Sequence, residues 1–251
     1  MIPCVCGISA GQVTSGRLSR PGPLQQDTTF GSMFRLGIAR DTAKPIDLNV
    51  GQLDAATLLA AAERVNEQLE GSRSKNLELL DIYDVIDLRM LSGLVGELFS
   101  AIVEQLDDRL IKNPNLDGYP DLCDVSNLSS PPSPDSFLHF AGGGIEVKNT
   151  FGLQRTTDPI PLRGERSARV QPRLVWKAHH QFTNRLLALQ SDYIDGIPQV
   201  IAAFFADDLV PDDWTIKQQP KTGSTMTSFC ATKASAFEKL KRGAILLPEE
   251  D

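Results

Sequence analysis

The sequence predicts an α/β fold, because segments with a helical spacing of apolar residues are combined with short apolar runs that are typical of strands. The longest helical patterns lie at 54–69 and 77–106, where apolar residues recur three or four positions apart. Strand patterns lie at 144–148, where apolar and polar residues alternate, and at 198–205, which is almost continuously apolar. With 251 residues and a hydrophobic fraction of 41%, the chain can bury one sizeable core.

Residues 1–45 are predicted to form a loop-rich N-terminal arm. They are rich in Gly, Ser, Thr and Pro, carry scattered arginines and show little periodicity. Residues 46–251 are predicted to form a single domain. The N-terminus lacks the basic and apolar segments of a signal peptide, and no apolar run is as long as a membrane span. We therefore expect a cytoplasmic protein that does not enter a membrane.

Two helices are predicted before the candidate site. Asp54 can cap the first, which continues to Leu69. The second extends from about Leu77 to Leu106, with a break expected near 81–87, and Glu97 lies beside its apolar stripe of Leu91, Leu94, Val95, Leu98, Ile102 and Leu106. The glycines at 93 and 96 are small, so we expect them to let this helix approach the sheet closely.

The turn-rich segment 113–119 leads into a predicted strand at 120–125. Asp117 and Asp124 are expected to act in turns or behind the site, and not as direct ligands. After a proline-containing loop, 137–140 is predicted to be a strand that pairs with 144–148 across a run of three glycines. His139 lies in this strand and is expected at the surface or in a structural role.

The second half of the chain is predicted to contain further strands and helices. Residues 151–173 form a polar connection with five arginines, and 177–190 has the apolar spacing of a helix. The run 198–205 is the best candidate for a buried strand. Small hydroxyl residues alternate with bulkier ones at 223–230, before a short helix that ends near Arg242.

The net charge of −7 and an isoelectric point near 5.1 argue against binding of polyanions by bulk electrostatics. Any surface for nucleic acid would have to be locally basic and away from the acidic loop at 207–213. Basic residues are concentrated near the C-terminus, at Lys217, Lys221, Lys233, Lys239, Lys241 and Arg242. The cysteines lack zinc-site spacing and are expected to be reduced thiols: Cys4, Cys6, Cys123 and Cys230.

Two acids and a lysine form the candidate catalytic site. Asp121 follows Pro120 at the edge of one apolar run, and Glu146 and Lys148 flank Val147 in another. Residues two apart on a strand project from the same face, so we expect Glu146 and Lys148 to point together while Val147 packs on the sheet. Two carboxylates suit Mg²⁺, and an adjacent ammonium can orient or deprotonate a water. This combination is suited to phosphodiester hydrolysis.

Pro120-Asp121 and Glu146-Val147-Lys148 resemble the PD-(D/E)XK motif of a nuclease superfamily, and the chain looks most like a type II restriction endonuclease within it. The resemblance implies a restriction-endonuclease-like fold with a central mixed β-sheet flanked by helices. It implies Mg²⁺-dependent cleavage of double-stranded DNA at a short specific sequence, with Asp121 and Glu146 as metal ligands and Lys148 beside the water. It also implies that Glu97 supports the metal through a bound water, although Glu97 could equally be an ordinary solvated glutamate such as Glu104.

Other functions fit the same residues. One is a DNA-repair or junction-resolving nuclease of the same superfamily, which would recognise DNA shape. Another is a non-catalytic nucleic-acid-binding protein in which Glu-Val-Lys is only part of a strand. For a site-specific enzyme we expect a homodimer, because a two-fold protein matches a palindromic site. In a nuclease, 151–173 could contact the phosphate backbone or enter a groove, although such a long loop can also be disordered. Residues 223–230 could contact phosphates and base edges or form only a Thr-rich edge strand, and the N-terminal arm could contact DNA or a second subunit or be a poorly ordered terminus.

Overall fold

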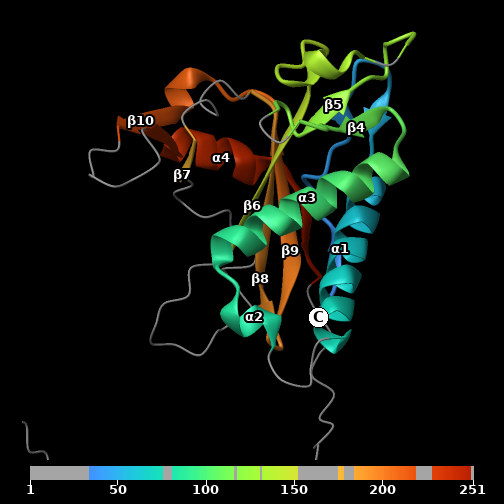
Figure 1. The fold of residues 1–251 in the computed structure, drawn as a ribbon. Coiled ribbons are helices and arrows are strands. Elements are labelled where there is room, and N and C mark those ends of the chain that lie inside the picture. Colours follow the sequence, from blue (N-terminus) through green and yellow to red (C-terminus); the bar gives the residue numbers. More distant parts are fainter. Residues whose placement is uncertain are drawn as a thin grey trace, which may run out of the picture. The chain divides into compact units, whose positions relative to one another are not determined.

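The computed structural model describes residues 34–75, 81–115, 118–130, 132–151, 175–177, 184–218 and 228–249. Within these ranges the chain forms helices packed on a mixed sheet of seven strands, which confirms the predicted α/β class (Figure 1). The helices are α1 (Ala55–Lys75), α2 (Ile82–Val85), α3 (Leu88–Leu106) and α4 (Ala234–Arg242). None of these described helices is long and apolar enough to cross a lipid bilayer.

The main sheet has the spatial order β1 (Leu36–Ile38), β12 (Ala244–Pro248), β9 (Ile197–Ala206), β8 (Leu186–Ile194), β6 (Gly144–Phe151), β5 (Leu122–Asp124) and β4 (Leu110–Lys112). Neighbouring strands are antiparallel, except that β6 and β8 are parallel. A second sheet has the order β10 (Trp214–Gln218), β11 (Ser228–Thr232) and β7 (Val175–Lys177), and β2 (Ile46–Asp47) pairs with β3 (Gln52–Leu53). Strand β6 therefore lies inside the main sheet, with a neighbour on each side.

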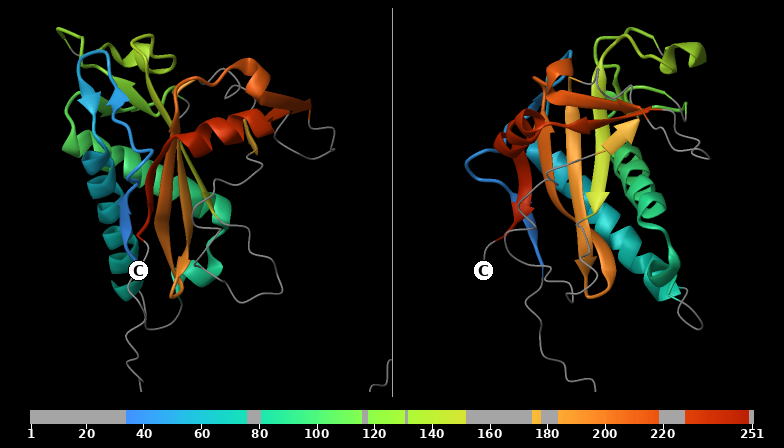
Figure 2. Two further views of the ribbon diagram at one scale, coloured as in Figure 1. Left: turned by 180° about the vertical axis from the view of Figure 1, so that it is seen from behind. Right: turned by 90° about the vertical axis from the view of Figure 1, so that its left-hand side faces the viewer.

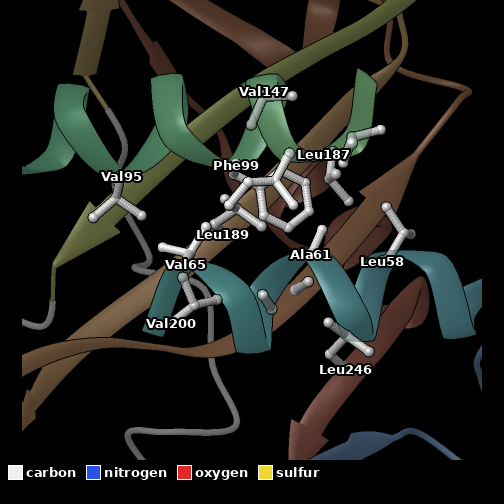
Figure 3. Packing of buried hydrophobic residues seen from close by; sticks show 14 of the residues in the cluster. Leu58, Ala61, Val65, Val95, Phe99, Val147, Leu187, Leu189, Val200 and Leu246 are labelled. Atoms are coloured by element: carbon white, nitrogen blue, oxygen red, sulfur yellow. The ribbon is translucent and has the colours of Figure 1, made fainter. Parts of the chain in front are cut away.

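Apolar side chains cover both faces of the central strands. On one face, Leu187 and Leu189 of β8 join α1 and α3 in the larger apolar cluster, and on the other face Leu186 and Ala188 join α4. Figure 2 shows α1 and α3 on one side of the sheet and α4 on the other. In the larger cluster, Phe99 of α3 packs among side chains of the sheet and of α1 (Figure 3). This burial on both sides explains why β9 is apolar along almost its whole length, and why β8 is apolar from Leu186 to Leu189.

The two predicted N-terminal helices are confirmed, and so is the cap predicted at Asp54. Asp54 Oδ1 accepts a hydrogen bond from Thr57 N at 2.7 Å, which caps α1. The expected break is present, because α2 ends at Val85 and Asp87 caps α3 by accepting from Arg89 N at 2.8 Å. The cap at Asp87 sets where α3 begins, and so which of its residues face β6.

The helix predicted at 177–190 is wrong where the structure describes this segment. β7 ends at Lys177 and β8 begins at Leu186, so Leu186–Gln190 is strand. Leucines and alanines that fill both faces of a central strand leave no alternation, and their spacing also fits a helix. The residues at 178–183, with the paired histidines, lie outside the described ranges.

The strand predicted at 137–140 is also wrong. A 3₁₀ helix at Pro134–Phe137 occupies its start, and His139 makes only an isolated bridge with Tyr119. Phe137 and Phe140 stack with ring centroids 5.7 Å apart in a small apolar cluster around Cys123. Two buried residues three positions apart share a side in a helical turn and not in a strand. The strands that flank β6 are β5 and β8.

The boundary predicted at 45/46 is wrong for the last part of the N-terminal arm. Strand β1 pairs with β12, and Leu36 is buried in the main core, so the domain includes residues from 34 onward. A three-residue edge strand is too short to show periodicity in the sequence. Residues 1–33, the arginine-rich residues 152–174 and most of 223–230 lie outside the described ranges, so their expected contacts stay predictions.

The basic C-terminal segment is partly structural. Lys239 Nζ lies 2.8 Å from Asp213 Oδ2, and the Asp213 carboxylate is buried. This ion pair joins α4 to the 3₁₀ helix at Pro211–Asp213. Lys241 and Arg242 are exposed, so of these three cations Lys239 is the one already engaged inside the domain.

Candidate active site at the β5–β6 junction

The structure brings Asp121, Glu146 and Lys148 together. Asp121 immediately precedes β5, and Lys148 Nζ on β6 lies 2.9 Å from Asp121 Oδ2 and 2.6 Å from Glu146 Oε1. Asp121 Oδ2 also accepts from Val147 N at 2.9 Å, and Glu146 Oε2 accepts from Asp121 N at 3.3 Å. Ile145 and Val147 lie in the apolar cluster, so the predicted division of β6 into a polar and an apolar face is confirmed.

Asn113 fixes the turn before β5 and thereby positions Asp121. Its buried side-chain amide donates to Pro120 O at 2.9 Å and to Phe137 O at 2.8 Å. Its backbone N–H donates to Asp121 O at 2.8 Å. Two backbone segments are thereby fixed to the end of β4. The sequence placed Asn113 only among turn formers, because its contacts across the loop depend on the fold.

Close approach between β5 and β6 sets the distance between the two acids. Cys123 pairs with Gly144, and a Cβ at Gly144 would lie 2.0 Å from Leu122 O. Cys123 is fully buried, and its thiol donates weakly to Pro120 O at 3.7 Å. Burial raises the pKa of this thiol to about 12. Cys123 is thus an inert packing residue.

The electrostatics of the cluster favour a charged lysine. Burial raises the pKa of Asp121 above its ordinary value, with Lys148 acting against this shift and Glu146 adding to it. Burial alone would lower the pKa of Lys148, but the charges of Asp121 and Glu146 outweigh it and hold that pKa above its ordinary value. Lys148 is therefore an ammonium at neutral pH. In this state it can orient a water or a phosphate oxygen, and it cannot accept a proton.

Glu97 lines a pocket together with Asp121 and Lys148, but its carboxylate forms an ion pair with a different residue. A pocket of about 210 Å³ is lined by residues that include Gly96, Glu97, Lys112, Asp121, Lys148 and Asn149. Glu97 Oε2 lies 2.7 Å from Lys112 Nζ, and the Glu97 side chain is 58% exposed. The structure therefore brings Glu97 to the candidate site and pairs it with a lysine that the sequence did not single out.

The glycines of α3 do not act as predicted. A Cβ added at Gly93 or Gly96 would meet no atom within 4 Å, so close packing against the sheet does not require either glycine. Both residues line the pocket. An alanine at either position would therefore add a methyl group at the wall of this pocket.

A polar chain of contacts that the sequence did not reveal fixes α3 to β6. Ser92 Oγ donates to Asn149 O at 2.6 Å, and Ser191 Oγ donates to Asn149 Oδ1 at 2.8 Å. Asn149 follows the motif lysine directly, and Ser191 lies on the parallel neighbour β8. A polar residue directly after the motif lysine was the available signal. These contacts position the helix that carries Glu97.

Two other polar residues near the site have the roles that were expected. Asp124 is fully buried and accepts hydrogen bonds from Asn49 N at 2.6 Å and from both Ser126 N and Ser126 Oγ, so it organises loops behind the site. His139 is exposed. Asp117 lies outside the described residues.

Asp121 and Glu146 are the residues of this site that could hold a hard divalent cation such as Mg²⁺. Three oxygens surround the Lys148 ammonium, because Val147 O lies 3.1 Å from Nζ in addition to the two carboxylate oxygens. The hydrogen bonds that Asp121 accepts from Val147 N and Lys148 Nζ both go to Oδ2, and within the described residues Oδ1 accepts none. In that part of the chain no third carboxylate, histidine or cysteine completes a group of metal ligands. Two carboxylates are enough for Mg²⁺, which keeps several waters.

Comparison of the chain with protein-family models, with curated proteins and with solved structures found no match. The functional argument therefore rests on the site itself.

Proposed function

We propose that this chain is a Mg²⁺-dependent endodeoxyribonuclease that hydrolyses phosphodiester bonds in double-stranded DNA at a short specific sequence. The observation that carries the proposal is that Lys148 contacts both Asp121 and the buried Glu146, and that Asp121 and Lys148 line one pocket. Their resemblance to the PD-(D/E)XK motif supports it. The proposal includes a restriction-endonuclease-like fold, a homodimer with one site for each DNA strand, and a cytoplasmic location.

In this proposal each residue has a defined task. Asp121 and Glu146 hold Mg²⁺, and Glu97 supports it from α3. When bound, the metal supplies positive charge for the phosphate oxygens that become more negative in the transition state. The Lys148 ammonium orients the attacking water or a phosphate oxygen. Its charge also allows the two carboxylates to lie close together before the metal binds.

A structural role for the cluster is the main competing interpretation. Lys148 could serve only to join the end of β5 to β6. However, removing charges from water costs several kcal/mol per ion, and well-packed apolar residues stabilise such positions equally well or better. The Glu146 side chain is only 2% exposed. A fold that needed only stability would gain little from a buried glutamate paired with a lysine that lines a pocket.

A plasmid assay tests the proposal. Purified protein should cut plasmid DNA in Mg²⁺ and not in EDTA, and digestion of DNA of known sequence should give discrete fragments. Linear product without accumulation of nicked circles would fit two sites that act together. Cleavage confined to branched DNA would favour the junction-resolving alternative. Absence of cleavage in both Mg²⁺ and Mn²⁺ would favour the non-catalytic alternative and contradict the proposal.

The open space at Gly96 provides a prediction in which stability and activity change in opposite directions. Gly96→Ala should stabilise the fold by up to about 1 kcal/mol, because alanine is the better helix former. The methyl group would also occupy space at the pocket, so we expect slower cleavage. Thermal unfolding and single-turnover cleavage measure the two effects.

Gly71→Ala is the matched control for that prediction. Gly71 is also helical with nothing within 4 Å of an added Cβ, but it lies on α1 and does not line the pocket. It should give a similar gain in stability and unchanged cleavage. Equal cleavage by both variants would show that the space at Gly96 is not used by the substrate.

A further inference from the structure

Two ammonium groups line the pocket among the residues that the structure describes, and they differ in how strongly they are held. Lys148 lies between Asp121 and the buried Glu146, at 2.9 and 2.6 Å. Lys112 contacts a single carboxylate, that of Glu97, at 2.7 Å. The Lys112 side chain is 28% exposed and that of Glu97 is 58% exposed. The Lys112 pair is therefore open to solvent on both sides.

We propose that Lys112 is a phosphate-binding residue of this site, held by Glu97 until DNA binds. The proposal rests on the nuclease function proposed above and extends it to a residue outside the motif. Its ligand is a backbone phosphate of the DNA strand that enters the pocket.

The strength of the two ion pairs supports this assignment. An exposed pair contributes only about 0–1 kcal/mol, so a phosphate can replace Glu97 as the partner of Lys112 at little cost. Taking Lys148 away from its partners would instead leave the buried Glu146 without its cation, which is far more costly. Of the two lysines, Lys112 is the one that substrate can recruit.

The position of Lys112 also supports the assignment. It ends β4, which lies at one end of the main sheet, and it pairs with Leu122, the residue after Asp121. The next residue, Asn113, donates its backbone N–H to Asp121 O. Lys112 is thus fixed to the same backbone segment as the metal-binding carboxylate. A phosphate held there would lie beside the metal and not at a distant part of the surface.

Glu97 would then have two successive partners. Three carboxylates and two ammonium groups give these five side chains a formal charge of −1, which one bound Mg²⁺ changes to +1. Once Glu97 turns toward the metal, its hold on Lys112 weakens. Metal binding and release of Lys112 are therefore coupled through a single glutamate.

The test measures binding of a fluorescein-labelled DNA duplex in Ca²⁺, which can occupy such carboxylates without supporting efficient chemistry. Lys112→Ala should weaken binding roughly tenfold, as expected for a lost charge-assisted hydrogen bond. It should also lower the slope of log affinity against log salt by about 0.9. Lys112→Arg, which keeps the charge, should retain the slope. Lys44→Ala removes an exposed lysine that lines a different pocket, and it should resemble the wild type.

A second arm tests the hold exerted by Glu97. In EDTA, Glu97→Gln should tighten DNA binding by up to roughly fivefold, and the gain should disappear in the Glu97→Gln/Lys112→Ala double variant. An equal gain in the Lys112→Ala background would show that only general repulsion was relieved, which contradicts the release of Lys112.

The outcomes separate this inference from the nuclease proposal. A wild-type protein that cuts DNA, together with a Lys112→Ala variant that matches Lys44→Ala in affinity and slope, would overturn the role of Lys112 alone. A wild-type protein that neither binds nor cuts DNA would overturn both proposals. Circular dichroism of each variant shows whether the fold is retained.

Discussion

Glu146→Gln, Asp121→Asn and Lys148→Met are each expected to reduce DNA cleavage by roughly a thousandfold or more, because loss of either carboxylate removes a ligand of the Mg²⁺ that would stabilise charge at the phosphate, and loss of Lys148 removes the ammonium beside it. The three variants should differ in binding. Loss of either carboxylate removes negative charge near the DNA, so specific binding should be kept or tightened. Loss of Lys148 removes positive charge, so binding should stay level or weaken slightly. Single-turnover cleavage and fluorescence anisotropy measure the two properties separately.

Stability in the absence of metal distinguishes Lys148→Met further. It leaves Asp121 and the buried Glu146 without the ammonium that lies within 2.9 and 2.6 Å of them. The variant should therefore melt at a lower temperature in EDTA, and Mg²⁺ or Ca²⁺ should restore more of its stability than in the wild type.

Glu104→Gln is the control for the carboxylate variants, because Glu104 is an exposed glutamate near the end of α3. It should cleave DNA like the wild type. Cleavage at near wild-type rates by Glu146→Gln or Lys148→Met would instead show that β6 is not part of the active site.

Gly144→Ala is expected to have the largest effect on the fold of any single methyl group at the site. The added Cβ would lie 2.0 Å from Leu122 O and 2.6 Å from Pro120 Cγ, at a backbone φ of +152°. Backbone atoms cannot rotate away, so β5 and β6 must separate. We expect a loss of about 3 kcal/mol, which lowers Tm by roughly 6–12 °C in a chain of this size. Thermal unfolding measures the loss, and cleavage should fall with it.

Gly143→Ala separates the effect of a steric clash from the effect of an unfavourable backbone conformation. Gly143 has a φ of +85°, but an added Cβ there meets nothing within 4 Å. It should cost only about 1–2 kcal/mol, from the left-handed conformation alone. If Gly144→Ala proves no more destabilising than Gly143→Ala, the strands are not held together as closely as the structure indicates.

Strand β6 was predictable because the placement of its polar and apolar side chains follows one local rule. Alternation along Ile145, Glu146, Val147 and Lys148 assigns polar side chains to one face and apolar ones to the other, and the structure has this arrangement. The cap at Asp54 was predictable for a similar reason, since a capping side chain bonds to the backbone two or three residues ahead.

The residues that were not predictable depend on contacts between distant elements. The pairing of Glu97 with Lys112 joins α3 to β4, and the clamp formed by Asn113 reaches Phe137 on the far side of a loop. Leu186 to Leu189 were assigned to a helix because a strand covered on both faces loses its alternation. In each case the partner across the fold, and not the neighbour along the chain, decides what the residue does.

Because Cys123 is fully buried, the rate at which its thiol is alkylated can report local opening of the structure at the site. With a fully buried side chain and a thiol pKa near 12, this cysteine presents almost no thiolate to a reagent in the closed state. Its alkylation must wait until β5 separates transiently from its neighbours, so the labelling rate counts these openings. Peptide mass spectrometry distinguishes Cys123 from Cys4, Cys6 and Cys230. The same measurement in Mg²⁺ or with DNA would report how strongly each ligand holds the two strands together.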